Sequence, residues 1–299
     1  MFVIFGASGN VGSTTVAALR KAGHPVRAVV RNERQAERFA TIGCEAVVAD
    51  LTDSASVRTA INGARAVQIL CPIPAADVDP ESTMRNMVDV AADALASAPG
   101  IHVLALSDYG AELSEGTGIT LLFHYLETQL RSLAGRLTLL RSAEHMQNWG
   151  RALPTVLQCG ILPSLHHPLT KLFPTVSAHD VGLAAAELLL DEPQSGLPRI
   201  VSIEGPERIS AAYVAQVLSE VGNKTVTPFA LPRSEWPAAL LRAGLTEKHA
   251  SLVADLYDAH NAGEIEVEDT RKTERRFGKT TLPEVISSLL TAHRGVPVT

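Results

Sequence analysis

Hydrophobic and polar positions alternate in a regular way along the first 142 residues. Short stretches such as "MFVIFG" (1–6) and "PVRAVVRN" (25–32) are apolar at consecutive positions, which is typical of strands buried on both faces of a sheet. The longer segments between such stretches have the length and pattern of helices, and several end at a glycine. This alternation predicts a parallel sheet covered by helices on both sides.

The pattern assigns each expected element to a residue range. The expected strands span 1–6, 25–32, 44–52, 64–74, 101–110 and 136–142. The expected helices span 10–23, 33–43, 54–63, 82–98 and 120–135. The predicted fold class is therefore α/β, with a Rossmann-type, doubly wound parallel sheet.

The regular alternation of strand and helix segments ends at about residue 150. Prolines and histidines interrupt the segment 162–174, and the later strands expected at 199–205 and 225–231 look short and isolated. Helices are expected at 209–222, 234–244 and 246–263. We therefore expect an NAD(P)-binding Rossmann domain over 1–150 and a smaller, mainly helical substrate-binding lobe over 151–299, interleaved with the first and not independent.

Composition narrows the class of protein. The chain has 299 residues, 46% of them hydrophobic, and a net charge of -6 without a basic stripe, so a large core is expected and nucleic-acid binding is not. No leader pattern and no run of about 18 apolar residues is found, so a cytoplasmic protein without a membrane segment is expected. Cys44, Cys71 and Cys159 fit neither a disulfide framework nor a zinc site, and we expect buried free thiols.

Three glycines follow the first strand and open the first helix. Gly6 allows a sharp turn, Gly9 removes a side chain where a pyrophosphate approaches, and Gly12 allows the helix to pack close to the strand. In a strand–turn–helix context this spacing predicts a dinucleotide site at the start of the helix. The alternative is a tight turn without a ligand. The expected cofactor contacts also include Ser8, Asn10 and Val11.

The end of the second strand distinguishes the two dinucleotides. NAD sites usually offer an acidic residue there, which binds the ribose 2′-hydroxyl. This chain offers Arg31 and Asn32, and a guanidinium suits a 2′-phosphate, so NADP(H) is favoured over NAD(H). Alternatively, Arg31 only ends a strand in solvent. Asp50 and Leu51 end the third strand where the adenine would lie, although Asp50 is also a candidate cap of the next helix.

Six segments of the chain share the pattern of a known family. They are "GASGNVG" (6–12), "VVRN" (29–32), "ADLTD" (49–53), "LSDYGAE" (106–112), "LLRSAEHMQNW" (139–149) and "VSAHDVGLAAAELL" (176–189). Together they resemble the NmrA-like group of atypical short-chain dehydrogenase/reductases, which includes NADPH-dependent quinone reductases and catalytically silent NADP(H) sensors. The resemblance implies a Rossmann fold, NADP(H) binding and a cleft between the carboxyl edge of the sheet and the C-terminal lobe.

A typical short-chain reductase pairs a tyrosine with a lysine four residues later, and this chain lacks that pair. Tyr125 is followed by Gln129, so no cation lowers the pKa of its phenol. In NmrA-like reductases a lysine often begins the corresponding helix, and the resemblance places His124 at that position with Glu127 in the matching acidic place. Histidine exchanges protons near neutral pH, so His124 is a candidate proton donor and cofactor contact. The alternative is a packed or cofactor-contacting histidine.

Further candidates follow the fourth and fifth strands, at the edge where open α/β sheets bind ligands. Ser107 matches a position where reductases of this superfamily often carry a hydroxyl near the nicotinamide, and it is a candidate for catalysis and cofactor binding. Tyr109 is a candidate catalytic and substrate contact, or a packing residue. Cys71 and Pro72 are expected to contact the cofactor through their backbone.

The last candidates lie beyond the sixth strand. Asn148 matches an asparagine of the family, with a nicotinamide amide or a substrate carbonyl as its partner. His166 and His167 invite a metal interpretation, but no cysteine or carboxylate stands nearby at ligand spacing, so no metal is expected. Asp180 is expected to cap the helix that begins beside it.

The sequence therefore favours an NADP(H)-binding oxidoreductase that transfers a hydride to a small quinone or carbonyl compound. The alternative is a catalytically silent NADP(H) redox sensor that acts through a regulatory protein partner. A third interpretation, an isoflavone-reductase-like enzyme, is disfavoured by the missing lysine. A homodimer is left open, and the substrate is not identified because specificity lies in the C-terminal lobe.

Overall fold

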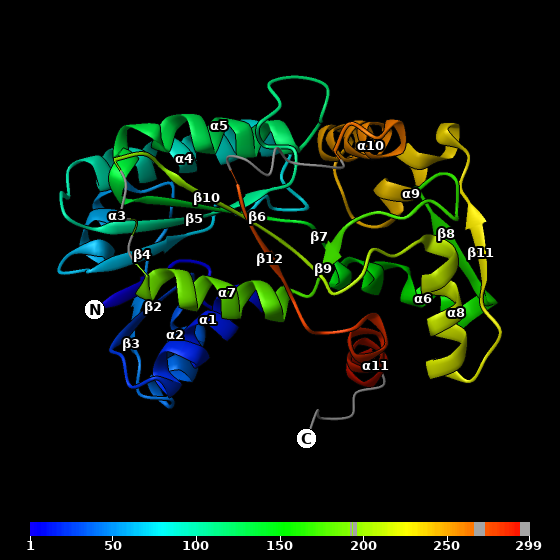
Figure 1. Ribbon diagram of the computed structural model, residues 1–299, viewed down its shortest axis with the longest axis horizontal. Helices are drawn as coiled ribbons and strands as arrows, with labels where there is room; N and C mark the ends of the chain where they lie inside the picture. The colour runs from blue at the N-terminus through cyan, green and yellow to red at the C-terminus, as the bar shows by residue number, and fades with distance from the viewer. Residues whose placement is uncertain (192, 194–195, 266–272, 294–299) are drawn as a thin grey trace.

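The large sheet of the protein consists entirely of parallel strands. The computed structural model describes residues 1–191, 193, 196–265 and 273–293. Within them an eight-stranded sheet has the order β3–β2–β1–β4–β5–β6–β10–β12 (Figure 1). The chain continues from β1 to β2 on one side and from β4 to β5 on the other, so the loops after these two neighbouring strands leave in opposite directions, which is where doubly wound sheets bind ligands. The predicted fold class is confirmed.

The strands are short, and most lie close to their expected positions. Those of the large sheet are β1 (Phe2–Ile4), β2 (Val26–Val30), β3 (Glu45–Val48), β4 (Ala66–Ile69), β5 (His102–Asp108), β6 (Leu137–Ser142), β10 (Arg199–Glu204) and β12 (Glu274–Phe277). Two small parallel pairs join β7 (Glu144–His145) to β9 (Thr175–Val176) and β8 (Ile161–Ser164) to β11 (Thr227–Ala230).

Helices cover both faces of the large sheet, as Figure 1 shows. One face carries α1 (Asn10–Lys21), α2 (Glu33–Ala40) and α7 (Ala178–Leu190), and the other carries α3 (Ser54–Ile61), α4 (Pro80–Ala96) and α5 (Thr120–Leu130). Side chains of β1 alternate between the two cores: Phe2 and Ile4 pack with the first group, whereas Val3 packs with the second. The consecutive apolar residues of this strand are therefore explained by burial on both sides.

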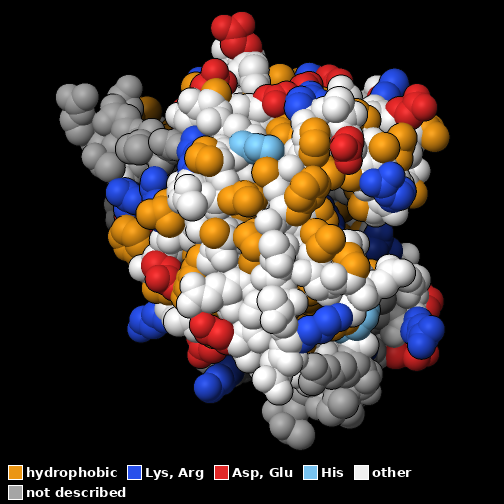
Figure 2. Space-filling model, turned by 90° about the vertical axis from the view of Figure 1, so that its right-hand side faces the viewer, with side chains coloured by type: hydrophobic (Ala, Val, Ile, Leu, Met, Phe, Trp, Pro, Cys, Tyr) orange, Lys and Arg blue, Asp and Glu red, His pale blue; other side chains and the backbone are white. Residues whose placement is uncertain are grey.

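The remaining helices gather beyond the carboxyl edge of the sheet. They are α6 (Leu153–Cys159), α8 (Ala211–Gly222), α9 (Trp236–Arg242), α10 (Glu247–Ala262) and α11 (Leu282–His293), with short 3-10 turns at Arg131–Arg136, Met146–Ala152 and Arg233–Glu235. They bury two smaller apolar cores, one around Trp149 and one around Trp236. Figure 2 faces this end and shows apolar side chains gathered on its surface. Exposed apolar residues of β8, β11 and α9 are Ile161, Phe229 and Leu241.

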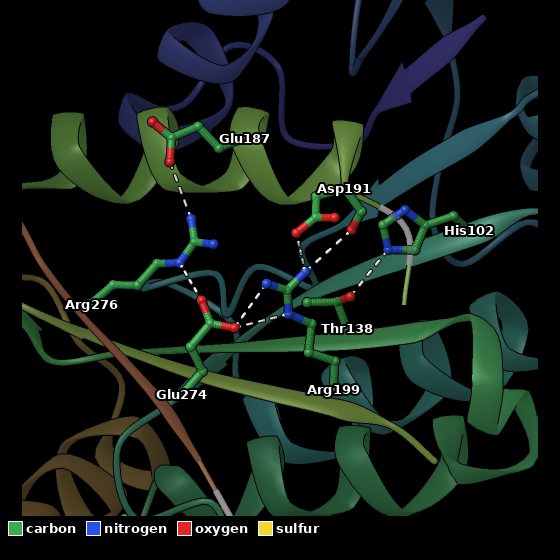
Figure 3. A network of polar contacts seen from close by, with 7 residues as sticks. All are labelled: His102, Thr138, Glu187, Asp191, Arg199, Glu274 and Arg276. Carbon is green, nitrogen blue, oxygen red and sulfur yellow. Dashed lines mark hydrogen bonds and ion pairs between the residues drawn. The ribbon is translucent and has the colours of Figure 1, made fainter. Parts of the chain in front are cut away.

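The strand expected at 199–205 is not isolated, and that prediction is wrong. β10 lies in the large sheet between β6 and β12, and β12 was not foreseen from the sequence. Arg199 of β10 forms ion pairs with Asp191 at the end of α7 and with Glu274 of β12, both at a distance of 2.8 Å (Figure 3). These contacts hold α7, β10 and β12 together. The division of the chain near residue 150 stays a prediction.

Two further expectations are corrected. Asp180 does not cap α7; the cap is Ser177, whose hydroxyl accepts a hydrogen bond from the His179 amide. The buried Asp180 carboxylate instead accepts hydrogen bonds of 2.8 Å from the amides of Lys279 and Thr280, and so holds the segment after β12. Among the three free thiols, Cys44 and Cys71 are buried as expected, but Cys159 is exposed.

Candidate cofactor and substrate site

The glycine loop joins β1 to α1 with a geometry that requires two of its glycines. Gly6 has a φ of +71°, a conformation that L-residues rarely adopt. A Cβ on Gly12 would overlap the backbone of Gly6 and Ala7, so the helix could not begin so close to the strand. These are the roles that the glycine spacing predicts for a dinucleotide-binding turn.

The start of α1 is suited to an anion. The cap residue, Gly9, is exposed and provides no side-chain cap, and the first turn of the helix holds no acidic residue. The nearest atom to a Cβ on Gly9 would be the Gly6 carbonyl oxygen at 3.4 Å, so the protein itself leaves this position open. Amide groups at the start of a helix attract phosphate. The loop therefore fits the pyrophosphate of a dinucleotide.

A cavity of about 630 Å³ opens beside this loop, at the ends of β2 and β3. Seven residues expected at the cofactor site line it together: Gly6, Ser8, Gly9, Arg31, Asp50, Leu51 and Pro72. Asn32 is not among its described lining residues; its side chain caps α2 by accepting a hydrogen bond from the Gln35 amide. Asn10 and Gly12 are likewise outside the described lining.

The polar groups of this cavity are held by local hydrogen bonds. The Arg31 side chain is exposed at the end of β2, and its backbone amide donates to Gln35 Oε1 over 3.1 Å. Asp50 accepts hydrogen bonds of 2.8 Å from the Thr52 amide and hydroxyl. The cap of α3 is Asp53, so the alternative role of Asp50 as that cap is wrong.

A second cavity, of about 470 Å³, lies at the carboxyl edge of the sheet. It shares Leu70 and Pro72 with the first cavity, so the two adjoin beside the point where the strand order reverses. Its wall includes six of the expected site residues: Val11, Cys71, Pro72, Ser107, Tyr109 and Asn148. Burial raises the pKa of the Cys71 thiol to about 12, so this cysteine is a poor nucleophile at neutral pH.

The hydroxyl of Ser107 is engaged in a buried network. It donates a hydrogen bond of 2.6 Å to Glu127 Oε1. Arg141 binds both oxygens of the same carboxylate, over 2.8 and 2.7 Å. Glu127 of α5 therefore fixes the end of β5 against β6, and in this arrangement the Ser107 proton points at a carboxylate.

His124 lies one turn before Glu127 on α5, partly buried. Its Nδ1 is 2.9 Å from the carbonyl oxygen of Ala111. A carbonyl only accepts, so Nδ1 carries the hydrogen in this contact. Among the described residues that line the second cavity, α5 contributes Phe123 and not His124. The catalytic and cofactor-binding roles of His124 stay predictions.

Asp108 is a cavity residue that the sequence analysis missed, although it stands inside the segment "LSDYGAE". It ends β5, lines the second cavity, and accepts a hydrogen bond of 2.8 Å from the Thr120 hydroxyl. Burial, with further repulsion from Glu144 and Glu112, raises the pKa of Asp108 to about 7. Its position at the end of a central strand was the signal that could have identified it.

Glu144 is the second missed residue, and it separates the second cavity from a third of about 500 Å³. His166 Nε2 lies 3.0 Å from Glu144 Oε2, and the Tyr257 hydroxyl donates to Oε1 over 2.9 Å. Burial would raise the pKa of Glu144, but the charge and hydrogen bond of His166, with Tyr257, lower it to about 2. Burial lowers the pKa of the neighbouring His145.

The histidine pair at 166–167 is part of this packing. The ring of His166 stacks on Phe173 with centroids 3.6 Å apart, and His167 Nε2 lies 3.1 Å from the Leu231 carbonyl oxygen. The described residues contain no group of three or more histidine, cysteine or acidic side chains placed to hold a metal ion. None of the described helices is long and apolar enough to cross a membrane.

Comparison with known proteins places the chain in a family. The model of the NmrA-like family matches residues 1–281. Quinone oxidoreductase 2 of Escherichia coli strain K12 is 26% identical over 298 residues, which cover 97% of this chain and 98% of that protein.

Two solved structures share the fold over nearly the whole chain. The NADPH complex of the E. coli quinone oxidoreductase QOR2 aligns with a TM-score of 0.78 and 22% identity, covering 97% of this chain and 100% of that one. The NADP(H) complex of Citrobacter sp. triphenylmethane reductase aligns with a TM-score of 0.76 and 22% identity, covering 96% and 99%. The chain belongs to the NmrA-like family.

Proposed function

We propose that the protein binds NADPH along the first two cavities and transfers its hydride to a small quinone or other carbonyl compound. The observation that carries this proposal is the continuity of the site. The cavity beside the glycine loop shares Leu70 and Pro72 with the cavity at the carboxyl edge. An extended dinucleotide therefore has a path from Arg31 to Ser107.

The residues of the first cavity fit NADPH in particular. The helix start at Gly9 suits the pyrophosphate, and the exposed guanidinium of Arg31 suits a 2′-phosphate. Bound NADPH supplies a hydride from its nicotinamide ring. The E. coli quinone oxidoreductase, which has also been solved in complex with NADPH, supports both the cofactor and the reaction class.

The second cavity suits a flat, mainly apolar acceptor. Leu106, Phe123 and Val253 are among the apolar side chains in its wall, whereas polar groups are supplied by Asp108, Asn148 and others. Such a wall excludes water from the reacting atoms while a few polar groups orient the acceptor. Asn148 lines this cavity, and its proposed partner is an acceptor carbonyl or the nicotinamide amide.

The test combines binding with turnover. NADPH and NADH affinities are measured by cofactor fluorescence, and NADPH oxidation is followed over a panel of quinones and aldehydes. We expect tighter binding of NADPH than of NADH, and turnover with at least one quinone. Tight NADPH binding without oxidation by any acceptor would contradict the proposal and favour an NADP(H) sensor that acts through a protein partner.

A further inference from the structure

Asp108 lines the second cavity, where the proposed reaction requires a proton donor. It follows Ser107 at the carboxyl end of β5, and it pairs in register with Ser142 of β6. One carboxylate oxygen, Oδ2, accepts from the Thr120 hydroxyl, while the residue also forms part of the cavity wall. The side chain is therefore anchored at one oxygen and borders the space where an acceptor would lie.

We propose that Asp108 donates the proton that completes reduction of the acceptor. This inference rests on the proposed function. The hydride from NADPH adds two electrons and one hydrogen to the quinone, which leaves an oxyanion. The O–H bond of the Asp108 carboxyl breaks, its proton forms the hydroquinone O–H bond, and the resulting carboxylate takes a new proton from solvent. The sum is NADPH, quinone and one proton giving NADP⁺ and hydroquinone.

The surroundings of Asp108 keep a proton on it near neutral pH. Burial has the largest effect and raises the pKa of Asp108, and repulsion from Glu144 and Glu112 raises it further. Hydrogen bonds from Thr120 and the Tyr109 amide lower it, and the resulting pKa is about 7. A general acid is most effective when its pKa lies near the working pH. The other titratable or charged residues among the described lining of this cavity are Cys71, Tyr109, Glu144, His145, Arg151, His249, Tyr257 and His260.

The first test compares pH profiles of quinone reduction by the unmodified protein, Asp108→Asn and Thr120→Val. The rate of the unmodified protein should fall as pH rises through about 7, because the carboxyl loses its proton. Asp108→Asn keeps the shape of the side chain but holds no transferable proton, so we expect a loss of roughly 10²–10⁴-fold in kcat and no fall near pH 7. Thr120→Val removes a hydroxyl that lowers the pKa, so the fall should move to higher pH.

The second test uses an acceptor that needs no proton. A triarylmethyl cation takes a hydride at its central carbon and becomes a neutral product without protonation. With a cation of this class that the unmodified protein reduces, Asp108→Asn should retain kcat within about threefold, whereas its quinone rate falls. Equal losses with both acceptors would overturn the proton-donor role and mark Asp108 as a structural or binding residue.

The third test needs neither cofactor nor acceptor. Folding raises the pKa of Asp108 from 3.8 to about 7, so its destabilising contribution grows as pH rises from about 4 to about 7 and is constant above that. The melting temperature of Asp108→Asn relative to the unmodified protein should therefore rise over this pH range and then level off. Difference infrared spectra should show a carboxyl band that disappears with a midpoint near 7 and is missing from the variant.

The outcomes separate this inference from the proposed function. If none of the acceptors supports NADPH oxidation by the unmodified protein, the proposed function fails and the donor role fails with it. If it reduces quinones and Asp108→Asn has the same kcat and the same pH profile, only the donor role is overturned. A variant with unchanged NADPH affinity, lost quinone turnover and a missing infrared band supports the inference.

Discussion

The hydroxyl of Tyr257 donates a hydrogen bond of 2.9 Å to Glu144 Oε1, and so ties α10 to the carboxyl edge of the large sheet. The other oxygen of Glu144 meets His166 at 3.0 Å. One carboxylate therefore joins three segments that are far apart in the sequence, and it stands in the wall between two cavities. Its ionisation therefore makes the contacts between these segments depend on pH.

Glu144→Gln should destabilise the protein most at neutral pH. Folding lowers the pKa of Glu144 from 4.5 to about 2, so its stabilising contribution is complete above about pH 4.5 and is lost as pH falls towards 2. Thermal unfolding at pH 7 and pH 3 should show a melting-temperature gap between the two proteins that shrinks at pH 3. Tyr257→Phe is the control, because it removes one hydrogen bond and keeps the carboxylate. A gap of equal size at both pH values would argue against this role.

Arg31→Ala should weaken NADPH binding much more than NADH binding. If the guanidinium binds the 2′-phosphate, its loss costs about 1.5–3 kcal/mol, or roughly 10- to 100-fold in Kd, and NADH has no phosphate to lose. Arg38→Ala is the control. It removes the same kind of charge from α2, the helix that follows Arg31, at a residue that is not among the described lining of the cavity. It should leave both affinities nearly unchanged. Equal affinity of the unmodified protein for the two cofactors would refute the assignment.

Gly9→Val and Gly12→Ala should fail in different ways. The position of Gly9 is open, so Gly9→Val should fold with nearly unchanged stability and lose dinucleotide binding, because its side chain occupies the place of the pyrophosphate. A Cβ on Gly12 overlaps the backbone of the turn, so Gly12→Ala should lose at least about 1–3 kcal/mol of stability. Fluorescence titration and chemical unfolding measure the two effects. Unchanged NADPH affinity in Gly9→Val would show that the loop is a turn that does not bind the dinucleotide.

His124→Ala should reduce turnover by less than about tenfold and keep the fall in rate near pH 7, because the proton comes from Asp108. The substitution removes the hydrogen bond from His124 Nδ1 to the Ala111 carbonyl oxygen, which joins α5 to the loop before it. Steady-state kinetics and NADPH titration measure turnover and cofactor affinity. A loss of roughly 10²–10⁴-fold with unchanged NADPH affinity and no fall in rate near pH 7 would instead assign the donor role to His124.

Local patterns were enough to predict the first six strands, their helices and the glycine loop. Burial on both faces makes every residue of β1 apolar, and backbone geometry alone requires glycine at positions 6 and 12. These constraints leave a mark in a short stretch of sequence, a run of apolar residues or a fixed glycine spacing. The place of Arg31 could also be predicted, because the end of the second strand lies beside the loop that ends the first in folds of this class.

Tertiary structure decided the features that depend on distant partners. β10 looked isolated because nothing near it in sequence shows that β6 and β12 flank it. Asp180 has the pattern of a helix cap, yet its carboxylate binds amides about 100 residues later. Asp108 is an ordinary acidic residue in the sequence, and only burial beside Glu144 and Glu112 raises its pKa to about 7. Burial and charge repulsion arise from packing, so the one-dimensional pattern does not contain them.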